Sequence, residues 1–422
     1  MELTKIYMDK VFLRLKNKTQ LCSALADDHY HTRLVHSLEV ASIAESIVEK
    51  LPTYFEIDKM AVIKGALLHD IGHTPFGHAG ERTLHKILSG NDTCFDLVCG
   101  IKEKGLAQGF KHNINSGLLY RESTPYSKVE YKVLDAIIKH TKIQYKTSTN
   151  ERLDYGFERV VNGIEMLKDD YYNDYPKYIE GYIVAVADEI AQICSNYLDI
   201  IRFDDTYEQR IKGTELLEEL NKAKKITSIA RLQVEYICTY LICEFVKELQ
   251  SKSKYDFLLD QTNSHFWQLI NSISHINDSI IKENTSIKLF DESKKTIIET
   301  LFAYYFITPE DLETKTIKSI IFALQDTNGL SSIHYKEIKA LIDMDDSEQF
   351  KEKAVELIKN SVDIVFNSTV KGNEKKRNET IVKVFLRYIA IHISKMTDNY
   401  ASQKYKKIVN GKTFLKNIKK NY

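Results

Sequence analysis

Glycine and proline, the residues that most folds use to turn, are scarce in this sequence. Its 422 residues include 16 glycines and 5 prolines. Sheets, barrels and loop-rich folds need turn residues at short intervals, so this scarcity argues against them. Apolar residues instead recur mostly at helical spacing, and alternating strand patterns are rare. We therefore predict a nearly all-α protein, long enough for two or three folding units.

Two early helices can be predicted in some detail. The apolar stripe of the first consists of Leu34, Leu38, Ala41, Val48 and Leu51. Pro52 ends this helix. A second helix is predicted from an N-cap at Asp58 to Leu68, with Gly72 beyond its end. Similar patterns cover residues 127–142, 157–168, 178–202, 214–250, 265–283, 292–306 and 350–366. The polar stretch KGNEKKRNE, residues 371–379, is predicted to be a loop.

Charge, cysteine usage and hydropathy argue against several classes of protein. The formal net charge is zero, so no global basic field points to nucleic acid or to a membrane. The six cysteines form no CxxC pair, which favours free buried thiols over disulfides or zinc knuckles. No apolar run reaches membrane-spanning length, and the first residues contain no apolar signal core. A cytoplasmic protein without a membrane partner is expected.

One short segment concentrates ionisable side chains. LLHDIGHTPFGHAGE, residues 67–81, holds three histidines, an aspartate and a glutamate. Nine of the 13 histidines lie at or before His140, so any chemistry is expected in the first half of the chain. His69 and Asp70 are adjacent, and adjacent side chains inside a helix point about 100° apart. Where the helix unwinds into the following loop, both side chains can converge on one ion.

Two further metal ligands would have to come from other segments. His36 lies on the preceding predicted helix, and Asp188 lies in the apolar stretch IVAVADEIA, where an unpaired carboxylate would be costly. Two imidazoles and two carboxylates suit a divalent ion such as Mn, Fe, Co, Ni or Zn. Such an ion lowers the pKa of bound water and supplies a hydroxide nucleophile near neutral pH. Taken alone, His36 also fits a satisfied core histidine, and Asp188 fits a hydrogen-bonded structural acid.

Several neighbouring residues fit phosphate chemistry. Arg33 shares a helical face with the histidine three residues later and could clamp phosphate oxygens. His73 and Glu81 flank the glycine–proline loop, as a candidate proton donor and a candidate water-orienting carboxylate. His112, in FKHNINS, is a further candidate for contact with phosphates. The other two histidines near this segment, His78 and His85, are interpreted as structural.

Seven blocks of this sequence, in order, resemble the signatures of the deoxynucleoside triphosphate triphosphohydrolases. This family is the dGTPase-like branch of the HD-domain superfamily of metal-dependent phosphohydrolases. The blocks are FLRLKNKTQL (12–21), DHYHTRLVHSLEVASIA (28–44), LLHDIGHTPFGHAGE (67–81), FKHNINS (110–116), IIKH (137–140), YIEGYIVAVADEIA (178–191) and MTDNYA (396–401). They cover residues 10–205 well, and the rest of the chain mainly through the last block.

The resemblance implies a role for each of a set of site residues. The implied metal ligands are His36, His69, Asp70 and Asp188, and the implied catalytic or phosphate-contacting residues are His73, Glu81 and His112. Arg33 would contact the phosphates, and Gln20 would approach the sugar 3′-hydroxyl. The implied cofactor is a divalent ion: Mn, Mg or another mid-row metal.

The resemblance also implies a reaction and partners. Water would attack the α-phosphorus of a deoxynucleoside triphosphate (dNTP), which releases a deoxynucleoside and inorganic tripolyphosphate. Members of the family usually assemble as oligomers, and several respond to nucleotides or single-stranded DNA at allosteric sites. A homo-oligomer with such an allosteric ligand is therefore expected here.

The chain departs from the family where the sugar is expected to bind. Gln192 stands where a tyrosine is common, and Asn196 stands where an aspartate commonly meets the sugar. Tyr182 stands where a glutamine is common. An asparagine can still hydrogen-bond a hydroxyl, so we assign Gln192 and Asn196 to substrate binding with altered selectivity.

The domain organisation and two alternative functions complete the prediction. Residues 1–205 are predicted to form an HD-type core, and residues 206–422 a C-terminal helical region for oligomerisation or regulation. The lysine-rich end, residues 401–422, is interpreted as a solvated helical tail or as a contact with nucleic acid or a partner. One alternative is another HD nucleotide phosphohydrolase. The other is a catalytically altered nucleotide sensor or nucleic-acid-binding protein. No motif identifies the preferred base or the native metal.

Overall fold

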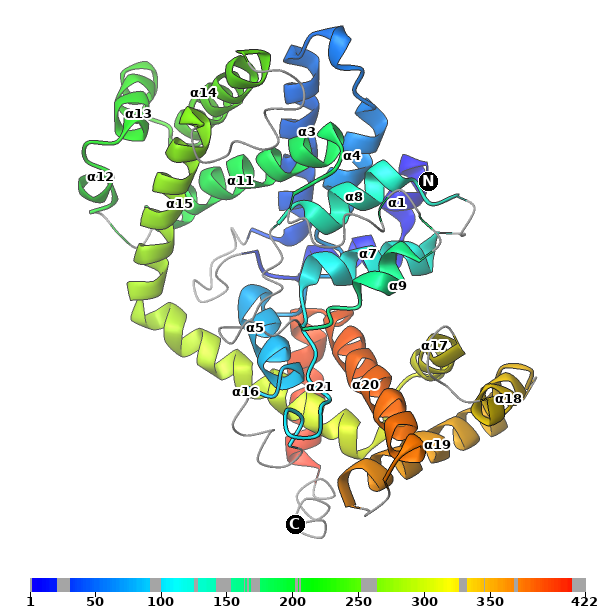
Figure 1. Ribbon diagram of the computed structural model, residues 1–422. Helices are drawn as coiled ribbons and strands as arrows, with labels where there is room; N and C mark the ends of the chain where they lie inside the picture. Colours follow the sequence, from blue (N-terminus) through cyan, green and yellow to red (C-terminus); the bar gives the residue numbers. More distant parts are fainter. Residues whose placement is uncertain are drawn as a thin grey trace. The chain divides into compact units, whose positions relative to one another are not determined.

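The fold is helical throughout the described part of the chain (Figure 1). The computed structural model describes residues 2–20, 31–91, 100–124, 128–141, 153–162, 164, 167, 175–201, 204, 206–251, 264–325, 332–344, 346–367 and 371–411. These residues form α-helices, short 3-10 helices and loops, and their only extended pairing is an antiparallel bridge between Thr19 and Thr32. The all-α prediction is confirmed.

The chain divides into two compact units, each built from segments that are far apart in the sequence. The first contains Met1–Gly72, His112–Gln144 and Phe157–Asp291. The second contains His73–Lys111, Tyr145–Gly156 and Glu292–Tyr422. The boundary expected at residue 205 stays a prediction.

The first unit contains most of the helices. They are α1 (Leu3–Met8), α2 (Lys10–Leu13), η1 (Arg14–Asn17), α3 (Arg33–Lys50), η2 (Thr53–Phe55), α4 (Lys59–Leu68), α7 (His112–Ser123), α8 (Tyr131–Lys139), α9 (Phe157–Val161), α11 (Ile179–Ile200), α12 (Tyr207–Arg210), α13 (Glu215–Ile226), α14 (Ala230–Ser251) and α15 (His265–Glu283). The predicted helix over 214–250 is two helices, α13 and α14.

Helices α3, α4, α8 and α11 pack against one another and form the core that carries the site. The first turns of helix α11 are deeply buried, with Ile183, Val184 and Val186 fully inaccessible to solvent. Helices α4 and α8 approach closely at Gly65, where an added Cβ would lie 2.7 Å from the Cβ of Ala136. Burial of these apolar faces is the main source of stability for such helices.

The ends of α3 and α4 follow the signals in the sequence. The side chain of Thr32 accepts a hydrogen bond from the Val35 amide at the start of α3. The carboxylate of Asp58 accepts from the Ala61 amide at 3.0 Å, as an N-cap should. Helix α3 ends before Pro52, and α4 ends at Leu68. Both helices and the Asp58 cap are therefore confirmed.

The buried face of α3 differs from the predicted apolar stripe. Leu38 is 44% exposed, whereas Arg33, His36 and Ser37 are buried together with Val40. The prediction assigned the inward face by hydrophobicity alone. Arg33 and His36 occupy that face because their partners, Asp70 and Asp188, lie in the core.

The second unit contains α5 and the late helices. They are α5 (Gly77–Leu88), η5 (Pro309–Asp311), α17 (Thr314–Gln325), α18 (Ser332–Ile342), α19 (Ser347–Asn367), α20 (Asn373–Ser394) and α21 (Asp398–Asn410). Helix α16 (Thr285–Ile307) begins among the residues of the first unit and continues among those of the second.

The loop predicted over residues 371–379 is wrong, because α20 begins at Asn373 and runs through most of that stretch. Glutamate, lysine and arginine are good helix formers, so a run of them on a solvated face is compatible with a helix. Gly372, with φ at 79°, precedes the first helical residue.

Two expectations about membranes and thiols can be compared with the structure. Among the described residues, no helix combines the length and the apolar character needed to cross a bilayer. Cys194, Cys238 and Cys243 are free thiols and are half-buried. The other three cysteines lie outside the described residues.

Candidate functional site

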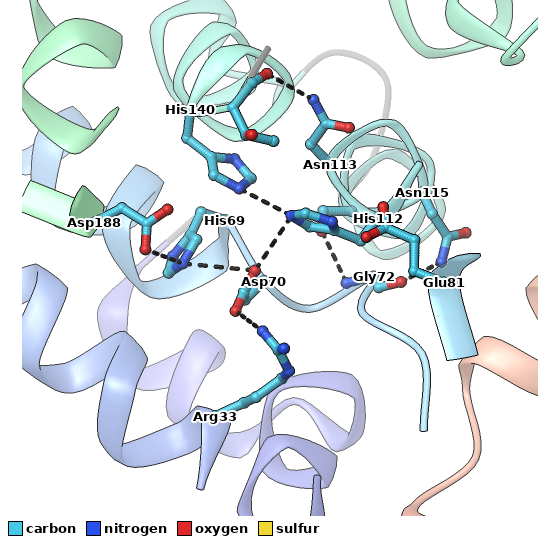
Figure 2. A network of polar contacts seen from close by, with 12 residues as sticks. Arg33, His69, Asp70, Gly72, Glu81, His112, Asn113, Asn115, His140 and Asp188 are labelled. Atoms are coloured by element: carbon cyan, nitrogen blue, oxygen red, sulfur yellow. Dashed lines mark hydrogen bonds and ion pairs between the residues drawn. The ribbon is translucent and has the colours of Figure 1, made fainter. Parts of the chain in front are cut away.

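The four predicted metal ligands converge in the first unit, where Figure 2 shows three of them. They are His36 of α3, His69 and Asp70 directly after α4, and Asp188 of α11. Ligand atoms of His36, His69 and Asp70 lie within 4.8 Å of one another, and so do those of His69, His140 and Asp188. Because His69 belongs to both groups, the four residues surround one place.

The geometry at His69 is that of a metal ligand. Its Nδ1 lies 2.7 Å from the carbonyl oxygen of Ala66, so Nδ1 carries the proton in the neutral ring and donates it. Its Nε2 has no hydrogen-bond partner among the described residues and lies 3.6 Å from one carboxylate oxygen each of Asp70 and Asp188. An Nε2 that faces two carboxylates needs a cation between them, either a proton on the ring or a metal ion. The donor set therefore fits a divalent ion.

Asp188 is held as a carboxylate by the histidines around it. Burial raises the pKa of its carboxyl group, but the hydrogen bond with His36 and the nearby His69 lower it further than burial raises it. The net pKa lies well below the usual range. The Oδ1 of Asp188 is 2.8 Å from Nε2 of His36. An ionised oxygen ligand is therefore available at neutral pH.

His140 belongs to the site as well, although no role was predicted for it beyond its place in the IIKH block. Its Nδ1 donates to the Ile137 carbonyl at 2.7 Å, and its Nε2 lies 3.2 Å from Nε2 of His112 (Figure 2). Burial, reinforced by the neighbouring His69, lowers the pKa of His140 to about 3. His140 is therefore neutral at physiological pH, and it accepts a hydrogen bond from His112.

The predicted phosphate contact, Arg33, is fully buried and tied to a metal ligand. Its Nη1 donates to Oδ2 of Asp70 at 2.5 Å, and its Nη2 donates to the backbone carbonyl of Gln20 at 3.2 Å. Its Nε is buried and has no hydrogen-bond partner among the described residues. Arg33 thus orients one metal ligand and still has one donor left for a ligand.

The predicted sugar-binding residues also lie in the first unit and contact one another. Gln20 follows η1, and Gln192 and Asn196 lie one helical turn apart on α11. The Gln20 amide donates to Gln192, and the Gln192 amide donates to Asn196. Their role in binding stays a prediction, but they form a continuous chain of hydrogen bonds.

The remaining predicted catalytic residues, His73 and Glu81, belong to the second unit. Both are buried, and with His78 they form a group whose ligand atoms lie within 4.8 Å of one another. His78, which was interpreted as structural, is half-exposed, and its Nδ1 lies 3.3 Å from Oε2 of Glu81. Its ring packs edge-on against His73. The proton-handling roles of His73 and Glu81 stay predictions.

The late MTDNYA block contacts the histidine-rich segment within the second unit. Phe76 adopts left-handed backbone angles, with φ at 63°, directly before α5. A phenylalanine is strained in this conformation. Its amide donates to the carboxylate of Asp398 at 2.9 Å, and Lys294 lies over its ring. Asp398, more than three hundred residues later, therefore helps to hold the turn that starts α5.

Gly72 fixes the turn that carries His69 and Asp70. Its amide donates to Oγ of Ser116, and its carbonyl accepts from the side chain of Asn115 at 2.6 Å (Figure 2). An added Cβ would lie 2.2 Å from the Ser116 backbone nitrogen, so α7 would have to move.

We expect Gly72→Ala to lower the free energy of unfolding by about 1–3 kcal/mol or more, because it overpacks this contact. Metal affinity should fall as well, since the turn carries two ligands. Ser116→Ala, which removes only one hydrogen bond, should cost about 1 kcal/mol and serves as the comparison. Urea unfolding and calorimetric Mn titration measure both effects. A Gly72→Ala protein with wild-type Mn affinity would show that the turn does not position the ligands.

The fold and the site define a class of protein. The HD domain, a helical domain that binds divalent metal ions through histidine and aspartate, matches residues 33–193 of the chain. This stretch contains all four predicted ligands: His36, His69, Asp70 and Asp188. The protein is an HD-domain phosphohydrolase.

Relatives place the chain within this class. A deoxyguanosinetriphosphate triphosphohydrolase-like protein of Rickettsia akari (strain Hartford) is 31% identical over 363 residues, 81% of this chain and 81% of the relative. Proteins of the same name from Rickettsia felis (strain ATCC VR-1525 / URRWXCal2) and Rickettsia rickettsii (strain Iowa) are 28% and 27% identical, each over 96% of this chain and 89% of the relative. The chain belongs to the deoxyguanosinetriphosphate triphosphohydrolase-like family, and the predicted membership is confirmed.

Proposed function

We propose that the protein is a metal-dependent hydrolase that cleaves dNTPs to a deoxynucleoside and inorganic tripolyphosphate. The observation that supports this most is the convergence of His36, His69, Asp70 and Asp188, with Nε2 of His69 facing two carboxylates. The relatives are named for deoxyguanosine triphosphate, so dGTP is the first substrate to test.

The four converging side chains would hold a divalent ion such as Mn or Mg, which would supply Lewis-acid activation of water and of the phosphate. Arg33 would donate from its unpartnered Nε to a phosphate oxygen. The proton-handling and charge-handling roles proposed for His112, His73 and Glu81 rest on the resemblance alone. The neutral His140 would keep the His112 ring oriented through their hydrogen bond.

The test is a panel of dNTPs and ribonucleoside triphosphates, incubated with the protein in Mn or Mg buffer. We expect tripolyphosphate and deoxynucleoside in equal amounts, and no reaction after chelation until metal is added back. Chromatography of the nucleoside and ion chromatography of the phosphates identify the products. Pyrophosphate with monophosphate as products, or no hydrolysis with any metal, would contradict the proposal.

The second candidate is a nucleotide sensor or nucleic-acid-binding protein that has lost turnover. The altered residues Gln192 and Asn196 favour it, because they change the wall expected to meet the sugar. A thermal-shift screen separates the two functions, since a bound ligand stabilises the folded state whether or not it is cleaved. Strong stabilisation by dNTPs without products, across several metals, supports the sensor. Cleavage of another nucleotide, such as a monophosphate or a cyclic nucleotide, would support a different HD activity.

We also propose, from the family alone, that the protein is a cytoplasmic homo-oligomer that responds to an allosteric nucleotide or to single-stranded DNA. The C-terminal region, residues 206–422, would carry the oligomer contacts or the regulation. Light scattering with and without nucleotide tests the assembly.

A further inference from the structure

Three amide side chains, one of them a helical turn after the predicted metal ligand Asp188 on α11, are joined by hydrogen bonds. The Nε2 of Gln20 donates to Oε1 of Gln192 at 3.2 Å, and the Nε2 of Gln192 donates to Oδ1 of Asn196 at 2.7 Å. Gln20 and Asn196 are each 5% exposed, and Gln192 is half-buried. The residues come from segments that are 172 positions apart, so the fold itself brings these amides together.

The backbone of Gln20 is fixed from both sides. Its amide donates to the His31 carbonyl at 3.2 Å, and its carbonyl accepts from Arg33 at 3.2 Å. The Thr19–Thr32 bridge reinforces this pairing. Arg33 also binds Asp70, so the anchor of Gln20 and a metal ligand share one guanidinium group. The amide of Gln20 therefore has a defined position relative to the metal centre.

One buried atom of this amide chain has no partner among the described residues. The Oε1 of Gln20 is buried and accepts no hydrogen bond from the described residues. A buried acceptor without a donor costs free energy, so such an atom marks a place where a donor from a ligand is expected. Since a carbonyl oxygen can only accept, the missing group must be an N–H or an O–H.

The direction of the amide chain sets which end of the Gln20 amide is left without a partner. Reversal of all three amides would also satisfy the two internal bonds, but it would leave Gln20 with an unpartnered N–H₂. The arrangement in the structure instead leaves Oε1 of Gln20 as an acceptor. An acceptor can bind the O–H of a hydroxyl group on a ligand. Gln192 and Asn196 thus decide whether Gln20 offers an acceptor or a donor.

We propose that Gln192 and Asn196 are positioning residues that hold the Gln20 amide with its oxygen toward the sugar 3′-hydroxyl of the bound nucleotide. This inference rests on the proposed function, which supplies a nucleotide with that hydroxyl. Where the family commonly has a tyrosine and an aspartate, this chain selects the sugar through a relay of amides. The group that the Gln20 oxygen would bind is a hydroxyl donor on the deoxyribose ring.

The test compares a dNTP with its 2′,3′-dideoxy analogue (ddNTP), which lacks the hydroxyl. Apparent dissociation constants come from thermal-shift titrations of the full chain in Mn buffer, and tripolyphosphate release is assayed in parallel. We expect the wild-type protein to bind the dNTP about five- to tenfold more tightly than the ddNTP. This ratio corresponds to the free energy of roughly one hydrogen bond. In Gln192→Met, which cannot bond Gln20, this ratio should fall to about twofold or less.

Two acidic variants test the direction of the relay. In Gln192→Glu, a carboxylate accepts from Gln20, and in Asn196→Asp, a carboxylate accepts from Gln192. Both should retain the wild-type ratio of dNTP to ddNTP affinity, even if the added charge weakens both affinities. Loss of the ratio in Asn196→Asp would show that the amides run in the opposite direction and would overturn the proposal.

The matched control is Gln233→Met, the same change at a buried glutamine of α14 whose bonds go to Tyr197 and Thr227. Its affinity ratio should equal that of the wild type. The proposal is overturned if the ratio of dNTP to ddNTP affinity is unchanged in Gln192→Met. It is also overturned if the wild type binds the two nucleotides equally. Absence of tripolyphosphate alone overturns the proposed function instead, so the two failures can be distinguished.

Discussion

Asp188→Ala and Asp70→Ala are expected to abolish hydrolysis while the far-ultraviolet circular dichroism of the helices is retained. Each removes one of the carboxylates that face Nε2 of His69. Loss of a residue that only supports a metal ligand costs about 10–100-fold in affinity or activity, so loss of a ligand should exceed about a hundredfold. Tripolyphosphate release measures hydrolysis, and calorimetric Mn titration measures metal binding. Both activities should be lost in each variant.

Asp70→Ala should have a lower free energy of unfolding than Asp188→Ala. Asp70→Ala also removes the partner of the buried Arg33, whereas Asp188→Ala leaves that pair intact. Asp199→Asn is a suitable control, since this residue lies eleven positions after Asp188 on α11, roughly 16 Å along the helix. It should retain Mn binding and turnover. Undiminished hydrolysis in either alanine variant would mean that the ligand assignment is wrong.

Arg33→Met is expected to lower both stability and activity. The Arg33–Asp70 pair is almost completely inaccessible to water, with side chains 2% and 4% exposed. Removal of one partner of a buried pair leaves the other charge uncompensated, which typically costs about 3–5 kcal/mol. The same guanidinium holds the Gln20 carbonyl. We therefore expect a lower free energy of unfolding in EDTA, without nucleotide, in addition to weaker nucleotide binding.

Arg33→Lys separates charge from geometry. A lysine keeps the positive charge, but it cannot donate to Asp70 and Gln20 in the fixed fork of a guanidinium. It should recover part of the stability but little of the activity. If Arg33→Met unfolds like the wild type in EDTA and loses only nucleotide affinity, Arg33 acts at the phosphates alone and does not hold Asp70.

The helical fold could be predicted from spacing and caps, but the inward face of α3 could not. Hydrophobicity alone placed Leu38 inward, yet it is 44% exposed, and Arg33 and His36 are buried. Their burial is tolerated because Asp70 and Asp188 pair with them, and these partners are distant in the sequence. Local pattern cannot reveal a compensating charge that only the tertiary fold supplies.

The metal ligands were predictable because they lie in recognisable blocks, whereas their neighbours were less so. His140 had no assigned role, since a histidine at the end of an ordinary amphipathic helix carries no local signal. Its position follows from the packing of α8 against α4 and α11. The contact of Phe76 with Asp398 was likewise unpredictable, because a motif does not specify what it touches.

His69 and His140 share one construction: each follows the last residue of a helix and donates from Nδ1 to a carbonyl three residues earlier, at 2.7 Å. The proton on each ring is therefore assigned by the helix backbone and by no other side chain. Substitutions of other side chains leave these two backbone bonds in place, so the protonated nitrogen of each neutral ring is insensitive to them. Helix length is the sensitive variable instead. An insertion of one residue in α4 would rotate the His69 side chain by about 100° and remove it from the site. We infer that, in this lineage, α4 and α8 can change their residues far more freely than their lengths.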